Sequence, residues 1–264
     1  MRRLRTAVLI SGRGSNMEAL IAAAESPDFP AEIALVLANR PEAQGLLHAK
    51  SRGIATAAVD HKIYAGREEF ERSMQIVLDA HKIEFICLAG FMRMLTPWFI
   101  GRWAGKMLNI HPALLPAYRG LHTHERAIED GVKIHGCTVH FVVPQMDEGP
   151  IVAQAAVPVL DADTPETLAA RVLEQEHRIY PLALRLVASH AVHVEGNRVL
   201  GAVARHGSGL TSPEGGWVSP QLPGQIAHPS APPSETTWRA RGGPTRFPSA
   251  KSNQSPVQWT PLEK

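Results

Sequence analysis

Two polar side chains that could carry out acid–base chemistry stand side by side in the stretch NIHPALLP, residues 109–116. An apolar run, 106–110, predicts a short buried strand that carries Asn109 and brings His111 directly after it. Side chains two residues apart in a strand point to the same side, so the amide and the imidazole would be neighbours. Such a pair suits an oxyanion site, because the amide donates a hydrogen bond and the imidazole can also transfer a proton.

Asp147 follows later in the chain, in a loop closed by Gly149 and Pro150. A carboxylate there could orient or charge the imidazole of His111. Taken alone, the pair Asn109 and His111 could equally be a loop-capping amide and a histidine with ordinary hydrogen bonds. The other segments of the chain decide between these interpretations.

A glycine-rich turn, Gly12 to Asn16, follows the first apolar run and opens the first predicted helix. Glycine allows close backbone approach, and the free N–H groups at a helix start favour an anion such as phosphate. A dinucleotide-binding fingerprint is not matched, because Met17 replaces its third glycine and Asn39 replaces its ribose-binding acid. We therefore expect a phosphomonoester here; a simple strand-to-helix turn is the alternative.

The segment Phe91 to Leu95 follows a strand end at Ala89 and Gly90. Apolar side chains at such an edge could hold a flat heteroaromatic ring, or they could belong to the core. His122 and His124 suggest a metal site together with His111. No acidic or cysteine ligand pattern accompanies them, so we expect no metal.

The composition, 44% hydrophobic and 20% charged residues, is typical of a soluble globular protein. No apolar run approaches the length of a membrane span. Cys87 and Cys137, the only cysteines, lie in apolar segments, which favours a reducing compartment and a cytoplasmic protein. The net charge of +2 arises entirely after residue 205, so the rest of the chain is neutral and predicts no nucleic-acid surface.

Strand and helix patterns alternate along the first part of the chain. Apolar runs predict strands at 6–11, 32–38, 56–59, 85–89 and 107–110, and helical patterns lie at 16–25, 42–52 and 67–82. Near-continuous apolar strands between helices indicate an α/β fold, a doubly wound, mainly parallel sheet of Rossmann type.

After Gly120 the pattern changes. A short helix at 123–130 precedes two strands at 138–143 and 151–157 that we expect to be adjacent. A long helix begins near Thr164 with Pro165 at its first position. Pro181 is expected to kink it before residue 189, and a hairpin around 195–197 ends a catalytic domain spanning 1–205.

Residues 206–264 differ sharply in composition from the rest of the chain. They contain ten of the 21 prolines, with Gly, Ser and Thr at most other positions. This composition predicts a disordered tail. Three of the five tryptophans lie in it and could mark a docking segment.

Six segments, in their order and spacing, resemble the phosphoribosylglycinamide formyltransferase family over residues 5–203. These segments are 10–16, 88–93, 109–112, 120–124, 136–141 and 175–177. Two positions depart from the family pattern: Ala113 replaces the usual Ser, and Met94 replaces a common Ile. Neither position supplies an essential side chain.

The resemblance implies transfer of a formyl group from 10-formyltetrahydrofolate to the amine of glycinamide ribonucleotide, without a metal. It implies that Asn109 and His111 receive the oxygen of the tetrahedral intermediate, with His111 as proton donor assisted by Asp147. The implied phosphate site consists of Gly14, Ser15, Asn16 and Met17, and Glu176 would bind the glycinamide or ribose portion. The implied folate site consists of Arg67, Met92, Arg93, Met94, Leu95 and Asn109. The expected partners are these small molecules alone, with the protein a monomer or a homodimer.

Three alternatives fit the sequence less well. A formyltetrahydrofolate deformylase carries a regulatory domain ahead of the catalytic one, whereas here the first strand begins within six residues of Met1. A methionyl-tRNA formyltransferase has a folded basic C-terminal domain, which the predicted tail does not resemble. A non-catalytic nucleotide-binding module gives no reason for Asn109, His111 and Asp147 to occur together.

Overall fold

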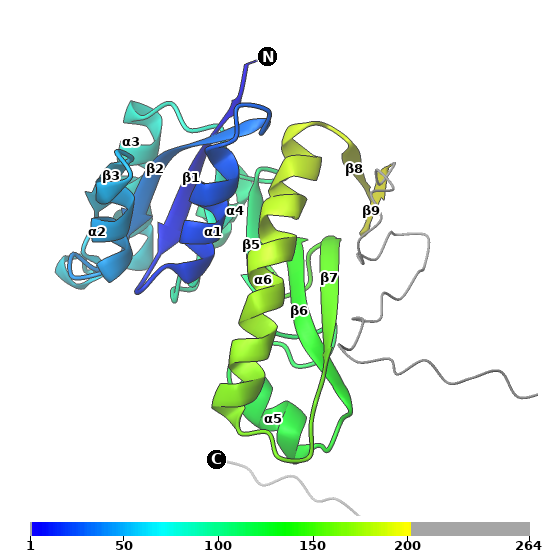
Figure 1. Ribbon diagram of the computed structural model, residues 1–264. Helices are drawn as coiled ribbons and strands as arrows, with labels where there is room; N and C mark the ends of the chain where they lie inside the picture. Colours follow the sequence, from blue (N-terminus) through cyan, green and yellow to red (C-terminus); the bar gives the residue numbers. More distant parts are fainter. Residues whose placement is uncertain (1, 202–264) are drawn as a thin grey trace, which may run out of the picture. The chain divides into compact units, whose positions relative to one another are not determined.

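The computed structural model describes residues 2–201, all within the first of two units of the chain, Met1–Gln221. A seven-stranded sheet with the order β3-β2-β1-β4-β5-β6-β7 forms its centre (Figure 1). The strands are β1 (Leu4–Ile10), β2 (Ala31–Ala38), β3 (Ala55–Ala58), β4 (Phe85–Leu88), β5 (Met107–His111), β6 (Ile134–Phe141) and β7 (Ile151–Pro158). The predicted tail and the boundary at residue 205 lie outside the described residues.

Six α-helices and a small hairpin complete the described part. The helices are α1 (Ser15–Ala24), α2 (Gln44–Ser51), α3 (Arg67–Ala80), α4 (Pro97–Arg102), α5 (Thr123–Glu129) and α6 (Pro165–Ala188). A 3₁₀ turn spans His61–Ile63, and β8 (Val192–Glu195) pairs with β9 (Arg198–Gly201).

The strand directions explain where helices are needed. β1 pairs in parallel with β2 and β4, and β4 pairs in parallel with β5. Parallel neighbours require a crossover connection, which the helices between them provide. β6 is antiparallel to both β5 and β7. The predicted mainly parallel α/β fold is therefore confirmed, as is the adjacency of the two strands after α5.

Each face of the sheet buries its own hydrophobic core, because alternate residues of a strand point to opposite faces. Val8 and Ile10 of β1 pack in the core that includes residues of α1 and α6. Ala7 and Leu9 pack in the other core, with residues of α3 and α4. Helices thus cover both faces, which holds the strand ends in fixed positions.

The carboxyl ends of β1, β4 and β5 lie together at one edge of the sheet. Leu9 of β1 is level with Leu88 of β4, and Leu88 is level with Asn109 of β5. The loops that follow β1 and β4 are therefore neighbours of the catalytic residues predicted on β5. Edges of this kind, beyond the carboxyl ends of parallel strands, are the usual ligand sites of such folds.

The helix α4 is the main element that the sequence did not predict. Its six residues are too few to show a helical period, although Thr96 and Pro97 form a recognisable start signal. Helix α6 begins as expected, with Thr164 as its cap, and runs through Pro181 to Ala188 without interruption. The kink expected at Pro181 stays a prediction.

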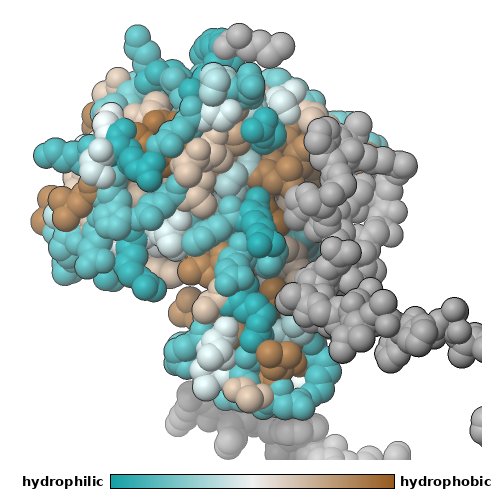
Figure 2. Space-filling model, in the orientation of Figure 1, coloured by the Kyte–Doolittle hydropathy of each residue, from teal (hydrophilic) through white to brown (hydrophobic). Residues whose placement is uncertain are grey.

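The face drawn in Figure 2 carries mostly hydrophilic side chains, with smaller apolar areas between them. Within residues 2–201, no helix combines the length and the apolar character needed to cross a membrane.

Candidate active site

The strand β5 supplies both of the polar side chains that open the candidate site. Asn109 is half-buried and His111 is buried. Both side chains lie on the same side of the strand as Met107, which packs in the core that includes residues of α3 and α4. The two side chains therefore share one side, as the spacing predicted.

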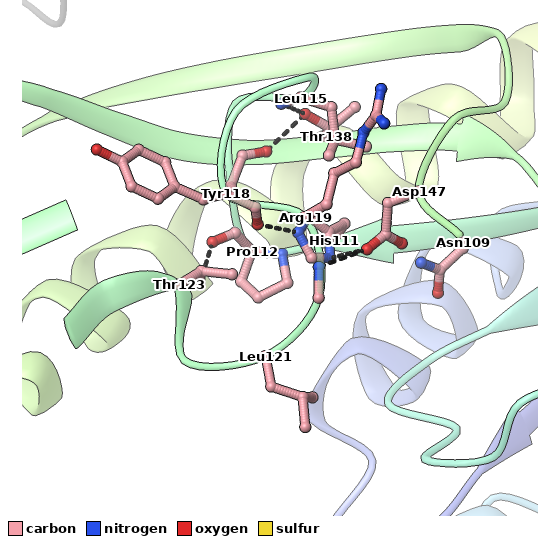
Figure 3. A network of polar contacts seen from close by, with 12 residues as sticks. Asn109, His111, Pro112, Leu115, Tyr118, Arg119, Leu121, Thr123, Thr138 and Asp147 are labelled. Carbon is pink, nitrogen blue, oxygen red and sulfur yellow. Dashed lines mark hydrogen bonds and ion pairs between the residues drawn. The ribbon is translucent and has the colours of Figure 1, made fainter. Parts of the chain in front are cut away.

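Both ring nitrogens of His111 have defined neighbours (Figure 3). Nε2 lies 2.9 Å from the carbonyl oxygen of Tyr118, which can only accept, so Nε2 carries a hydrogen. Nδ1 lies 3.6 Å from the Oδ2 atom of Asp147. This is an ion-pair distance, too long for a hydrogen bond, and a proton on Nδ1 would face the carboxylate.

Asp147 is held in place by its own backbone and by the loop that follows β5. Its φ of 55° is left-handed, a conformation that Asp tolerates better than most residues. Oδ2 accepts a hydrogen bond from the backbone N–H of Gly120 at 2.9 Å. Oδ1 lies 3.8 Å from Nε2 of a second histidine, His140. The carboxylate is thus positioned between two imidazoles.

His140 is a site residue whose role no local sequence pattern predicts. It lies directly opposite Asn109 in the β5–β6 ladder and is buried. Nδ1 donates to the carbonyl of Phe141 at 2.9 Å, so Nε2 is left to accept from Nδ2 of Asn109 at 3.3 Å. Burial lowers the pKa of His140, which keeps the ring neutral. The contact fixes which end of the Asn109 amide is the donor.

Gly149 brings the Asp147 loop against β6. A Cβ atom on Gly149 would lie 1.7 Å from the carbonyl oxygen of Phe141 and 3.5 Å from Nδ1 of His140. No other residue fits this approach without moving the backbone. The glycine that the sequence marked as closing the loop therefore sets the spacing between Asp147 and His140.

The segment between β5 and α5 is fastened to its surroundings by side chains. Thr138 of β6 donates its hydroxyl to the carbonyl of Ala113 at 2.6 Å and accepts from the N–H of Leu115 at 3.0 Å. Arg119 forms an ion pair with Glu148, next to Asp147. These contacts support the Tyr118 carbonyl that binds His111.

The glycine turn after β1 is built as the sequence predicted. Gly14 is the N-cap of α1, with a left-handed φ of 82°. Helix α2 packs directly against the turn, because the N–H of Gly45 donates to the carbonyl of Gly12 at 3.0 Å. Met17 is fully buried, so only its backbone can serve a ligand.

A hollow of about 370 Å³ lies over this turn. It is lined by residues 11–16, Arg40, Ala89, Gly90 and Met92, so the loops after β1 and β4 share it. Arg13 and Arg40 make it positive. Arg40 was missed in the sequence, although a basic residue directly after the second strand, beside Asn39, was a usable signal.

Asn16 and Glu176, both expected to bind substrate, are in direct contact. Nδ2 of Asn16 donates to Oε2 of Glu176 at 2.6 Å, which joins the start of α1 to α6. Burial raises the pKa of Glu176, and the bond from Asn16 opposes that rise. Within the described residues, Oδ1 of Asn16 is buried without a hydrogen-bond partner, so it can accept from a ligand.

The loop after β4 presents the apolar side chains expected to line a ring site. Met92 and Met94 are 66% and 55% exposed, whereas Arg93 and Leu95 are half-buried. The N–H of Met92 donates to Oγ of Ser11 at 2.8 Å, which ties this loop to the glycine turn. Arg67, the first residue of α3, is exposed.

His122 and His124, which suggested a metal site, contact other groups in the structure. His122 is exposed and lies 3.3 Å from Glu125, and His124 packs edge-on against the ring of His135 at 5.3 Å. Across residues 2–201, no three His, Cys, Asp or Glu side chains are grouped so that they could hold a metal ion.

Comparisons with known proteins agree on one family. The formyl transferase family matches residues 4–184. The phosphoribosylglycinamide formyltransferase of Escherichia coli (strain K12) is 42% identical over 190 residues, covering 72% of this chain and 90% of that enzyme. The trifunctional purine biosynthetic protein adenosine-3 of Gallus gallus is 50% identical over 192 residues, which is 73% of this chain. The chain spans only 19% of that longer protein.

Solved structures give the same result for the fold. The crystal structure of phosphoribosylglycinamide formyltransferase from Brucella melitensis is 54% identical, with a TM-score of 0.68, and the match covers 76% of this chain and all of that one. A formyltetrahydrofolate deformylase from Pseudomonas syringae pv. tomato is 24% identical, with a TM-score of 0.70, covering 76% of this chain and 66% of that one. This second likeness concerns the fold alone.

Proposed function

The chain belongs to the formyl transferase family, among its phosphoribosylglycinamide formyltransferases, and from that premise we propose that it formylates glycinamide ribonucleotide with 10-formyltetrahydrofolate. The observation that carries the proposal is the meeting of three elements at one sheet edge. An anion-binding turn follows β1, an apolar loop follows β4, and Asn109 and His111 end β5. Acceptor, donor and catalytic side chains would therefore be neighbours.

The acceptor phosphate would occupy the hollow over the glycine turn. Backbone N–H groups of Gly14, Ser15 and Asn16 open α1 there, and Arg13 and Arg40 add positive charge. Asn16 offers a buried oxygen that accepts a hydrogen bond, and Glu176 lies beside it. These two groups suit the hydroxyl and amide donors of a ribosyl glycinamide.

The folate would bind against the loop after β4. Met92 and Met94 provide exposed apolar surface for a flat ring, with Leu95 behind them. Arg93 and Arg67 provide positive charge for the carboxylates of the folate tail. Asn109, level with Leu88 at the end of β4, would be next to the formyl group.

The reaction would use the side chains in fixed roles. The amine nitrogen of glycinamide ribonucleotide bonds to the formyl carbon, whose oxygen becomes an oxyanion beside Asn109 and His111. The carbon–N10 bond then breaks. One proton leaves the amine, and one proton reaches N10. His111, with Asp147 facing its Nδ1, is the group we assign to that proton transfer.

The deformylase alternative differs in the acceptor, which would be water. The positive hollow favours a phosphorylated acceptor over water, because a hydrolase needs no anion site on that side. The assay that separates the two measures tetrahydrofolate release with and without glycinamide ribonucleotide. Rapid release only when the ribonucleotide is present supports the transferase. Equal release without it would establish the hydrolase.

The compartment and assembly are also proposals. Cys87 and Cys137 are buried free thiols, and burial raises the pKa of Cys87 to about 12. Unreactive buried thiols of this kind are common in reducing compartments, which supports a cytoplasmic enzyme. A monomer or a homodimer stays a prediction.

A further inference from the structure

Helix α3 carries a row of polar residues at intervals of four, Arg67, Glu71 and Gln75, which places them on one side of the helix. Glu71 and Gln75 are buried, whereas Arg67 at the start of the helix is exposed. A buried carboxylate is uncommon unless other groups bind it. The partners of Glu71 lie at the end of the loop that follows β4.

Both oxygens of Glu71 bind the same residue, Thr96. Oε1 accepts from the backbone N–H of Thr96 at 2.7 Å, and Oε2 accepts from its hydroxyl. Thr96 is also the N-cap of α4, because its Oγ1 accepts from the N–H of Phe99 at 3.4 Å. One carboxylate therefore fixes the point where the loop ends and α4 begins.

The beginning of the same loop is fixed independently. The N–H of Met92 donates to Oγ of Ser11, and that hydroxyl donates to Oδ1 of Asn39 at 2.6 Å. Arg93, Met94 and Leu95 lie between these two fixed points. The backbone of the proposed folate loop is thus held at one end by Ser11, the residue after β1, and at the other by α3.

Burial raises the pKa of Glu71, while the two bonds from Thr96 and the charge of Arg67 oppose that rise. Desolvating a carboxylate is unfavourable, and its partners recover only part of the lost free energy. An apolar residue would pack in this core at lower cost. The carboxylate is therefore better explained by what it holds in place than by stability.

Building on the proposed function, we propose that Glu71 is a positioning residue of the folate site. Its two bonds to Thr96 hold residues 93–95 in the conformation that binds folate. The residue does not touch the phosphate hollow. Folate affinity should therefore depend on Glu71, and affinity for glycinamide ribonucleotide should not.

The test compares Glu71→Gln with the matched variant Gln75→Met in the full chain. Gln75 is one turn further along α3 and accepts from the indole N–H of Trp103 at 2.8 Å, at the other end of α4. Each variant weakens a buried polar bond between α3 and α4, but only Glu71→Gln acts on the loop. KM values for both substrates and the Kd for tetrahydrofolate are measured alongside melting temperatures.

We expect Glu71→Gln to raise the KM for 10-formyltetrahydrofolate and the Kd for tetrahydrofolate about tenfold, since a neutral acceptor binds Thr96 less strongly. The KM for glycinamide ribonucleotide should stay within about twofold, a change too small to reflect a lost hydrogen bond. Gln75→Met should lower the melting temperature with little change in either KM. Equal changes in both KM values for Glu71→Gln, or none, would overturn the proposal.

A second variant covers the case in which Glu71→Gln does not fold. Thr96→Val keeps the backbone N–H that binds Oε1 and removes the hydroxyl that binds Oε2, so it should weaken folate binding selectively but less. An unchanged Kd for tetrahydrofolate in folded Thr96→Val would also refute the role. If the wild-type chain neither turns over nor binds folate, the proposed function has failed instead.

Discussion

Asn109 has one amide nitrogen with two N–H groups, and His140 uses one of them. The other remains for an oxyanion, because the amide cannot turn without placing its oxygen against the lone pair of His140. Two residues facing each other across a strand pair thus determine the donor geometry. Pre-oriented donors of this kind are usually worth more to catalysis than donors that must rotate into place.

If Asn109 and His111 are the oxyanion donors, removing either should slow the reaction strongly. Asn109→Ala and His111→Ala should each lower kcat by roughly 10² to 10³, the usual effect of losing one such donor. Steady-state kinetics with circular dichroism to verify folding would measure this. His193→Ala, at an exposed histidine of β8 outside the catalytic cluster, is the control. Wild-type turnover by folded His111→Ala would contradict the assignment.

Glu176 should show a conflict between stability and function. Glu176→Gln keeps an oxygen for Asn16 and removes a buried charge, whose raised pKa reflects unfavourable burial. We expect a higher melting temperature at pH 8 and a higher KM for glycinamide ribonucleotide. Thermal unfolding and kinetics test both. A lower melting temperature with unchanged KM would refute this role.

At the scale of elements, the turn between β1 and α1 depends on backbone that no side chain obstructs. A Cβ on Gly14 would lie 3.2 Å from Cε of Met17, and its φ of 82° disfavours other residues. Gly14→Val should therefore weaken binding of glycinamide ribonucleotide while leaving folate affinity nearly unchanged.

Calorimetric titration of Gly14→Val with each ligand measures this selectivity. Gly101→Ala in α4 is a suitable control, because a Cβ there meets no atom within 4 Å. Similar weakening of both ligands in Gly14→Val would indicate general misfolding instead.

Sequence patterns predicted elements well where each pattern is local. The strand carrying Asn109 and His111, the glycine turn and the cap at Thr164 all follow from neighbouring residues. The roles of His140 and Glu71 depend on contacts between distant segments, such as the reversed direction of β6. The spacing of residues within one segment does not reveal which distant segments will contact it.

Helix α4 was missed for a different reason. Six residues give less than two turns, so hydrophobic periodicity could not reveal them. The helix is stabilised from outside, by Glu71 at its cap and by Gln75 at Trp103. Its capping pair, Thr96 and Pro97, was the only local signal.

For the molecule as a whole, several histidines make stability sensitive to acid, as does Asp163, whose pKa its bonds to Arg171 hold well below the usual range. Burial lowers the pKa of His124, His135, His140 and His177, that of His135 to about 4. In the unfolded chain these groups titrate near 6.5. As the pH falls from about 6.5 to about 4, the unfolded state binds more protons than the folded state. The stabilisation that the neutral histidines provide above pH 6.5 is therefore lost. The raised pKa values of Glu71 and Glu176 act in the opposite direction.

His135 allows this behaviour to be tested at one position. Its ring packs edge-on against Tyr118 at 5.6 Å, a contact that a phenyl ring can retain. As the pH falls from 6.5 to 4, the free energy of unfolding should therefore decrease less for His135→Phe than for the wild type. Urea unfolding across that range measures the slope. His193→Phe, at an exposed position, should match the wild type.

The strand order also determines how long an acceptor must be. Leu9, Leu88 and Asn109 are level in β1, β4 and β5, and neighbouring strands are about 4.8 Å apart. The anion turn is therefore separated from the catalytic amide by two strand spacings, about 10 Å measured across the sheet. Residues 12–16 of the turn lie beyond Leu9, so a molecule anchored there by its phosphate must span at least about that distance to present an amine to Asn109. The sheet would thus select against acceptors too short to reach from the turn to Asn109.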